Sequence, residues 1–170
     1  MRLEAQMALD IAEKDLDEEQ IRWFSKLPIT RTVDDHILLV HGALTDRDDY
    51  ILNNHAININ KQILKKEYPG FDICFFGHTH LGLIAGNGST RSDFPESDII
   101  DLCPGQKYLI NPGSVGQPRD RVPLSSFIIF DTEQSQITVI RLEYDIEKEQ
   151  ERMQAAGLPD KLWQRIALGR

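Results

Sequence analysis

Three histidines that follow short apolar runs are the residues of this sequence best suited to chemistry. His78 and His80 form a Gly-His-Thr-His motif after the apolar run 71–76, and His41 follows the apolar run 37–40. Residues two apart in an extended backbone project from the same side, so we expect both imidazoles of the motif to face one cavity. Neutral imidazole is a common ligand for transition-metal ions, and ligands usually bind at strand ends in α/β sheets. The three histidines are therefore candidate metal ligands.

The histidine motif also has a plainer interpretation. A His-x-His pattern is short and occurs by chance in solvated loops, and a single histidine after a strand is often a core residue. The two motifs together favour a shared site, because His41 ends a different strand from His78 and can reach the same edge of the sheet. We expect His36, at the other end of its strand, and His55, at the start of a helix, to be structural or solvated.

A dense run of turn-forming residues supplies a further candidate. Residues 111–119 read NPGSVGQPR and follow the apolar run 108–110. Glycines and exposed backbone N–H groups can approach an anion closely, and the guanidinium of Arg119 can clamp a phosphoryl oxygen. The segment 111–114 is explained more simply as a rigid loop between strands. Arg119 remains a candidate substrate contact.

The first elements that position these residues are helices. Apolar residues at helical spacing predict a helix near the N-terminus, and Asp17 with Gln20 forms a capping box that starts a second one before Pro28. The residues expected on the buried face of this second helix are Ile21, Phe24 and Leu27. A third helix is expected over about 55–68, with Ile59, Ile63 and Leu64 on one side.

The remaining pattern predicts strands and two late helices. Residues 37–40 and 71–76 are apolar runs typical of buried strands, with the third helix between them. The polar stretch 86–98 indicates a loop, and the later strands are expected near 99–100, 108–110, 127–130 and 137–142. Helical spacing returns from Asp145 onward. An α/β fold is therefore expected.

Composition limits the classes of function. The chain has 170 residues and a formal net charge of −8, which fits one domain and opposes binding to nucleic acid. A phosphate-bearing substrate stays open, because bound cations can reverse the potential locally. Cys74 and Cys103 form no CxxC pair, which favours a reducing cytoplasm over a disulfide framework. No apolar segment approaches membrane-spanning length, so no membrane association is expected.

In this order, the segments 39–42 (LVHG), 77–80 (GHTH) and 111–119 resemble the last motifs of calcineurin-like metallophosphoesterases, in particular the bacterial phosphodiesterase-like branch. The resemblance runs through the chain, including 144–147 and 155–159 near its C-terminus. The combination is far more specific than any single motif.

The resemblance implies a partial four-layer α/β/β/α sandwich with a mixed β-sheet and flanking helices. Its strand ends would hold two divalent ions, such as manganese, zinc, iron or nickel, bridged by an aspartate. By matching motifs, His41 and His78 would bind one ion and His80 the other. The ions would activate water for attack on the phosphorus of a phosphomonoester or phosphodiester.

The resemblance does not reach the acidic motifs that open the family. The first residue of this chain resembles a point shortly after the third of these motifs, so we expect residues 1–170 to be one N-terminally truncated domain that holds the C-terminal half of the site. The missing ligands would come from an N-terminal segment or a second chain. Asp46, Asp48 and Asp49 are expected to form a solvated turn instead of replacing them.

Three functional interpretations follow. The chain is half of a phosphoesterase, nearly inactive alone, or a catalytically silent scaffold or binding module derived from that family. The third interpretation is a hydrolase with one ion on three histidines, because three imidazoles and a water form a competent zinc site. The family arrangement argues against this last interpretation, since it places His80 on a different ion from His41 and His78.

Overall fold

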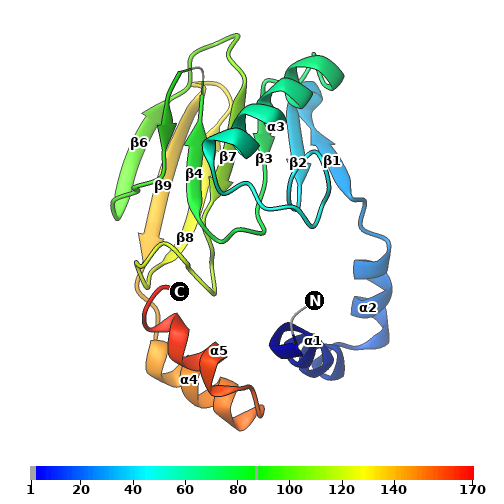
Figure 1. The fold of residues 1–170 in the computed structure, drawn as a ribbon, viewed down its shortest axis with the longest axis vertical. Helices are drawn as coiled ribbons and strands as arrows, with labels where there is room; N and C mark the ends of the chain where they lie inside the picture. Colours follow the sequence, from blue (N-terminus) through cyan, green and yellow to red (C-terminus); the bar gives the residue numbers. More distant parts are fainter. Residues whose placement is uncertain (1–2, 87) are drawn as a thin grey trace.

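Two β-sheets organise the protein, and the computed structural model describes residues 3–86 and 88–170 (Figure 1). The first sheet has six strands in the order β1, β2, β3, β7, β4, β5, and the second has three in the order β6, β9, β8. The strands of the first sheet are β1 Thr30–Val33, β2 Ile37–Val40, β3 Ile73–Phe75, β7 Tyr108–Pro112, β4 Gly82–Ala85 and β5 Thr90–Arg91. The strands of the second are β6 Ser97–Asp101, β9 Gln136–Leu142 and β8 Ser125–Asp131. The helices are α1 Leu3–Asp15, α2 Glu18–Ser25, α3 Asn54–Glu67, α4 Ile146–Ala155, α5 Asp160–Ile166 and the 3-10 turn η1 Asp34–His36.

The six-stranded sheet is mixed. Strands β2, β3 and β7 are parallel, with Leu38 opposite Cys74 and Cys74 opposite Leu109. The outer strands β1, β4 and β5 pair antiparallel. Because the central strands run the same way, the loops that follow them meet at one edge of the sheet, the lower edge in Figure 1. This edge carries His41, His78 and the 111–119 loop.

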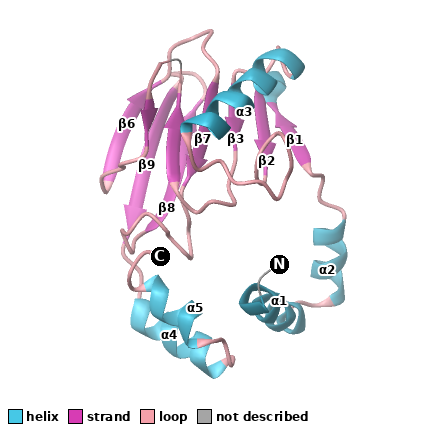
Figure 2. Ribbon diagram, viewed as in Figure 1, coloured by secondary structure: helices cyan, strands magenta, loops and turns pink. Residues whose placement is uncertain are grey.

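Two apolar cores separate the layers. Helix α3 packs on one face of the six-stranded sheet through a core that includes Leu38, Leu64, Cys74, Ala85 and Leu109. The second core lies between the sheets and includes Ile73, Tyr108, Ile110, Ile137 and Val139. The order helix, sheet, sheet is visible in Figure 2 and confirms the α/β class with a mixed sheet and flanking helices.

The fourth layer of the expected sandwich is not formed by the described residues. Ile99 and Ile129 on the outer face of the three-stranded sheet are 62% and 54% exposed. Helices α4 and α5 lie beyond the end of that sheet, and α1 and α2 lie beyond the end of the other (Figure 1). An ion pair of 3.9 Å between Lys161 Nζ and Glu4 Oε1 links the two helix pairs.

Helix α2 has the predicted start but not the predicted buried face. The carboxylate of Asp17 accepts from the backbone N–H of Gln20, and the Gln20 side chain accepts from the Asp17 N–H, which confirms the capping box. The apolar side chains are 38%, 52% and 45% exposed for Ile21, Phe24 and Leu27 respectively. The prediction of burial is therefore wrong, because α2 lies beyond the sheet and no described layer covers this side.

The polar stretch 86–98 is not a plain loop. It contains β5 and the start of β6, and Phe94 within it is buried. Phe94 packs under Gly82, where an added Cβ would lie 2.5 Å from the Phe94 ring. Strand β4 thus uses a glycine to let the aromatic ring approach its backbone. Among the described residues, no helix is both long and apolar enough to cross a membrane.

Candidate metal and phosphate site

His41 and His78 meet at the lower edge of the six-stranded sheet. Nε2 of His41 lies 3.0 Å from Nδ1 of His78, and the ring centroids are 4.8 Å apart. The backbone N–H of Gly77 donates to the His41 carbonyl at 2.8 Å, which continues the pairing of β2 and β3 beyond the strands. The pairing of β2 and β3 therefore brings the two ring nitrogens together at this edge of the sheet.

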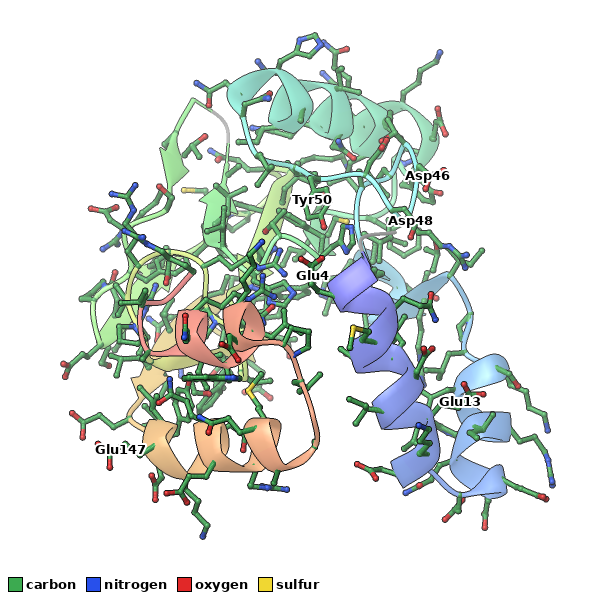
Figure 3. The ribbon with its side chains drawn as sticks, turned by 60° about the horizontal axis from the view of Figure 1, so that its bottom comes forward. Glu4, Glu13, Asp46, Asp48, Tyr50 and Glu147 are labelled. Carbon is green, nitrogen blue, oxygen red and sulfur yellow. The ribbon has the colours of Figure 1, made fainter. Side chains whose placement is uncertain are left out.

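The other nitrogen of His78 fixes the tautomer of its ring. Nε2–H of His78 donates to the Asp48 carbonyl at 3.1 Å, so Nδ1 presents its lone pair toward His41. The ring of Tyr50 stacks on His78 with centroids 4.1 Å apart and planes inclined by 27°. Figure 3 shows Tyr50 and Asp48 together on the loop that follows β2. This loop holds the His78 ring from two sides.

His80 is held separately. Its Nδ1–H donates to the Gln117 carbonyl at 2.8 Å, and Ser114 Oγ lies 3.2 Å from the same nitrogen. Ser114 Oγ also accepts from the Gln117 N–H. This arrangement leaves Nε2 of His80 as the lone-pair nitrogen. A backbone carbonyl that binds the second ring nitrogen is typical of histidines that ligate metals.

The backbone of the histidine motif is not extended, and the predicted conformation is wrong. His78 and His80 have φ values of 64° and 59°, in the left-handed region that L-residues with a Cβ seldom occupy. A turn bond from the Thr79 N–H to the Gly77 carbonyl, 2.7 Å long, closes the bend. The His78 ring therefore contacts His41 and Tyr50, whereas the His80 ring contacts Gln117 and Ser114.

Asn111 locks this bend from the neighbouring strand. Its Nδ2 donates to the Gly77 carbonyl at 2.9 Å and to Thr79 Oγ1 at 3.0 Å, and its Oδ1 accepts from the Gly113 N–H. Thr79 Oγ1 in turn accepts from the Leu81 N–H. The end of strand β7 thus shapes the histidine loop. The Asn-Pro-Gly run at 111–113 was the one sequence signal for this role.

Arg119 lies next to His80. Its backbone N–H donates to the His80 carbonyl at 3.2 Å, and its Nη2 donates to Gln117 Oε1 at 3.0 Å. Its Nε is buried with no hydrogen-bond partner among the described residues. The guanidinium keeps donor capacity for an anion at this edge of the sheet.

Burial favours the neutral form of two of these histidines. Burial lowers the pKa of His41, and the neighbouring His78 lowers it further. Burial also lowers the pKa of His80, opposed by its bond to the Gln117 carbonyl. A neutral imidazole keeps the lone pair that a metal ligand needs.

The acidic residues of the loop after His41 behave as a turn. Asp46 Oδ1 accepts from the Asp48 N–H, and Asp49 Oδ2 accepts from Thr45 Oγ1. Their side chains are exposed, and Figure 3 shows Asp46 and Asp48 on the outside of the loop. Within residues 3–86 and 88–170, no three histidine, cysteine or acidic side chains form a cluster that could hold an ion. The structure therefore brings His41 and His78 together but does not place His80 with them.

A model of the calcineurin-like phosphoesterase superfamily domain matches residues 10–135 of the chain. The chain belongs to the calcineurin-like phosphoesterase superfamily. The uncharacterized protein MJ0912 of Methanocaldococcus jannaschii is 35% identical over 128 residues, which cover 71% of this chain and 52% of that protein. The chain thus spans about half the length of this curated relative.

Two crystal structures share the fold of this chain. A metallophosphoesterase from Sphaerobacter thermophilus has a TM-score of 0.80 and 32% identity, with 92% of this chain and 64% of that chain covered. The hypothetical protein PH1004 from Pyrococcus horikoshii OT3 has a TM-score of 0.68 and 18% identity, over 92% of this chain and 57% of that one. At that identity the second similarity shows the fold alone.

The positions of the two ring nitrogens fit a divalent ion. Two nitrogens bound to one zinc ion at about 2.0–2.1 Å lie about 3 Å apart when the angle between them is near 90–110°. The 3.0 Å between His41 Nε2 and His78 Nδ1 agrees with this spacing. The His41 Nε2–H donates to His78 Nδ1, because His78 carries its own proton on Nε2. An ion would replace that single shared proton.

Proposed function

We propose that this chain carries part of the active site of a metal-dependent phosphoesterase that hydrolyses phosphomonoesters or phosphodiesters. His41 and His78 hold one divalent ion and His80 a second, with manganese, zinc, iron or nickel as candidates. The observation that carries the proposal is the 3.0 Å approach of two ring nitrogens, one of which is fixed as an acceptor by the Asp48 carbonyl.

In this proposal the side chains of the chain bind the ions and orient the substrate and the ligand rings. Bound divalent ions supply electrostatic stabilisation of phosphoryl oxygens and lower the pKa of water. The guanidinium of Arg119, held by Gln117 beside His80, orients a phosphoryl oxygen through its remaining N–H donors. Tyr50 and the Asp48 carbonyl keep the His78 ring in one orientation. Gln117 and Ser114 do the same for His80.

We propose that the acidic ligands of the two-ion site come from outside the described residues. The three histidines leave most coordination positions of two ions open, and the acidic residues nearest in sequence are tied into a solvated turn. An N-terminal segment in the same protein or a second chain would supply them. The free thiols of Cys74 and Cys103 support a reducing compartment such as the cytoplasm.

A catalytically silent binding module is the second candidate. It is favoured by the separation of His80 from the other two histidines and by the lack of a three-donor cluster within the described residues. The same separation argues against a hydrolase with one ion on three histidines. The two remaining candidates differ in whether the chain, once the acidic ligands are supplied, hydrolyses a phosphate ester.

Metal binding tests the proposed ligand roles of His41 and His78. Equilibrium dialysis of the chain against manganese or zinc should give weak binding at no more than about one ion per chain. His41→Ala and His78→Ala should each weaken binding, and His55→Ala should not, because His55 is an exposed histidine of α3 outside the site. Equal binding by all three variants would remove His41 and His78 as ligands.

Hydrolysis of a phosphodiester tests the proposed phosphoesterase activity. The chain alone should hydrolyse bis-p-nitrophenyl phosphate at most in traces with manganese. Fusion to the N-terminal part of the Sphaerobacter thermophilus metallophosphoesterase, which is 32% identical over the matched region, should restore turnover. His80→Ala in the fusion should reduce it on the order of 10²-fold. A folded fusion that binds two ions and remains inactive would favour the silent module.

A further inference from the structure

A buried ion pair ties the segment that carries Arg119 to the three-stranded sheet. Nη2 of Arg141, on strand β9, donates to Oδ2 of Asp120 at 2.5 Å, and the two side chains are 2% and 13% exposed. Asp120 directly follows Arg119, the proposed phosphate contact. The pair therefore fixes the chain immediately after that contact.

The stability of the fold does not explain this ion pair. Nε and Nη1 of Arg141 are buried and have no hydrogen-bond partner among residues 3–86 and 88–170. Removal of a guanidinium from water costs free energy, and an apolar pair of similar size at a buried position is often at least as stable. Arg141 thus loses the hydration of two nitrogens with no described group in return. This points to a role in geometry.

The backbone that follows Arg119 forms an unfavourable turn. Oδ1 of Asp120 accepts from the Val122 N–H at 3.3 Å, and Arg121 between them has a φ of 68°, in the left-handed region. The Arg121 N–H donates to the Gly169 carbonyl at 2.8 Å, which ties the turn to the segment after α5. Backbone strain of this kind persists where the surrounding structure fixes it, and it is concentrated at functional sites.

Arg119 is thus held on both sides. Its own N–H donates to the His80 carbonyl, and its guanidinium donates to Gln117 Oε1. After it, the carboxylate of Asp120 is fixed to β9. Because the backbone is held on each side, the guanidinium has few positions open to it and stays beside His80.

We propose that Asp120 and Arg141 are positioning residues that hold the Arg119 guanidinium ready for a phosphoryl oxygen. Both act through Arg119 and do not themselves touch the phosphoryl group. The proposal deepens the phosphoesterase function and rests on it for the role of Arg119. A guanidinium held in advance loses less conformational freedom on binding, so the pair strengthens the contact that Arg119 makes.

A change in the length of the Asp120 side chain tests the positioning role. Asp120→Glu keeps a negative charge for Arg141 but adds one methylene between that charge and the backbone. A pair that only neutralises a buried charge is preserved by this change, whereas a positioning pair is not. Asp98→Glu is the matched control, because Asp98 pairs with Arg91 at the same distance of 2.5 Å and lies on β6, outside the turn 119–122.

Spectra of the chain in EDTA report the position of Arg119 without any catalytic step. Its buried Nε–H should give a separate ¹H–¹⁵N resonance that exchanges slowly with water in the parent chain and in Asp98→Glu. In Asp120→Glu the resonance should move to that of a solvated arginine and exchange about tenfold faster or more. The neutral double variant Asp120→Asn with Arg141→Met should do the same while keeping the urea midpoint of the parent.

The spectra decide the positioning role by themselves. An Arg119 resonance that is unchanged in both variants would overturn it. If one variant does not fold, the spectrum of the other decides. Unfolding of both would show that the pair is structural, which also overturns the proposal.

Turnover of bis-p-nitrophenyl phosphate by the fusion protein tests the link to Arg119. Arg119→Ala should lower kcat/KM on the order of tenfold or more, and Asp120→Glu should lower it by a similar factor. Because both changes act on the same group, their combination should cause no further loss. A multiplied loss would show that Asp120 acts independently of Arg119 and would overturn the proposal. An inactive fusion whose Arg119 resonance still responds to Asp120→Glu would contradict the phosphoesterase function and support the positioning role.

Discussion

The side-chain amide of Asn111 donates to Thr79 Oγ1 at 3.0 Å in a buried contact between the end of strand β7 and the loop after β3. Strand β7 leads into the loop that carries Ser114 and Gln117, and the loop after β3 carries His78 and His80. The contact therefore couples the shape of the histidine loop to the segment that fixes the His80 ring.

Replacement of Asn111 should cost both stability and metal binding. Asn111→Ala leaves the Gly77 carbonyl and the Gly113 N–H without their side-chain partner, which typically costs about 1–3 kcal/mol for a buried group. Urea unfolding measures this loss. Asn58→Ala, on the exposed side of α3, is the control and should change stability little. Similar unfolding midpoints for the two variants would show that the Asn111 bonds contribute no net stability.

The stack of Tyr50 on His78 should tune metal affinity. Tyr50→Ala removes a ring contact of about 0.5–1.5 kcal/mol, so the His78 ring becomes freer and metal affinity should fall about two- to tenfold. Tyr50→Phe keeps the ring and should bind metal as the parent does. Isothermal titration with manganese compares the two, and equal affinity for Tyr50→Ala would mean that Asp48 alone orients His78.

The lowered pKa values of His41 and His80 predict a pH dependence of stability. The unfolded chain takes up protons on these residues near the ordinary histidine value of 6.5, whereas the folded chain does so only at lower pH. The unfolded state therefore binds more protons between these values, and stability falls as the pH drops below about 6.5. Urea unfolding in EDTA between neutral and acidic pH measures this slope. His80→Gln should flatten it, and an unchanged slope would place its origin elsewhere.

The two cysteines should differ sharply in reactivity. Burial raises the pKa of Cys74 to about 12, whereas Cys103 is exposed. Iodoacetamide at pH 8 should therefore modify native protein at Cys103, and native Cys103→Ser should resist the reagent until denatured. Mass spectrometry of the intact protein reads the result. The folded chain also keeps the Cys74 proton that the unfolded chain loses near its ordinary value of 9.0, so this thiol lowers stability as the pH rises above that value.

The sequence predicted those elements whose signals lie within a few neighbouring residues. The apolar runs that form β2 and β3 are short and bounded by turns, and the capping box at Asp17 needs only residues three positions apart. The buried side of α2 could not be predicted, because burial depends on which layer lies opposite. For the same reason the histidine motif was predicted as extended. Its bend is set by bonds from Asn111, which lies more than thirty residues away in the chain.

His78 and His80 occupy backbone positions where a design procedure guided by conformational preference alone would choose glycine or asparagine. Each L-residue there costs about 1–2 kcal/mol relative to the right-handed region. Two ring side chains at such positions, two residues apart, thus form a rare pattern that can be searched for in other structures. Screening folds of unassigned function for paired left-handed histidines at a sheet edge would find sites of this kind without any alignment.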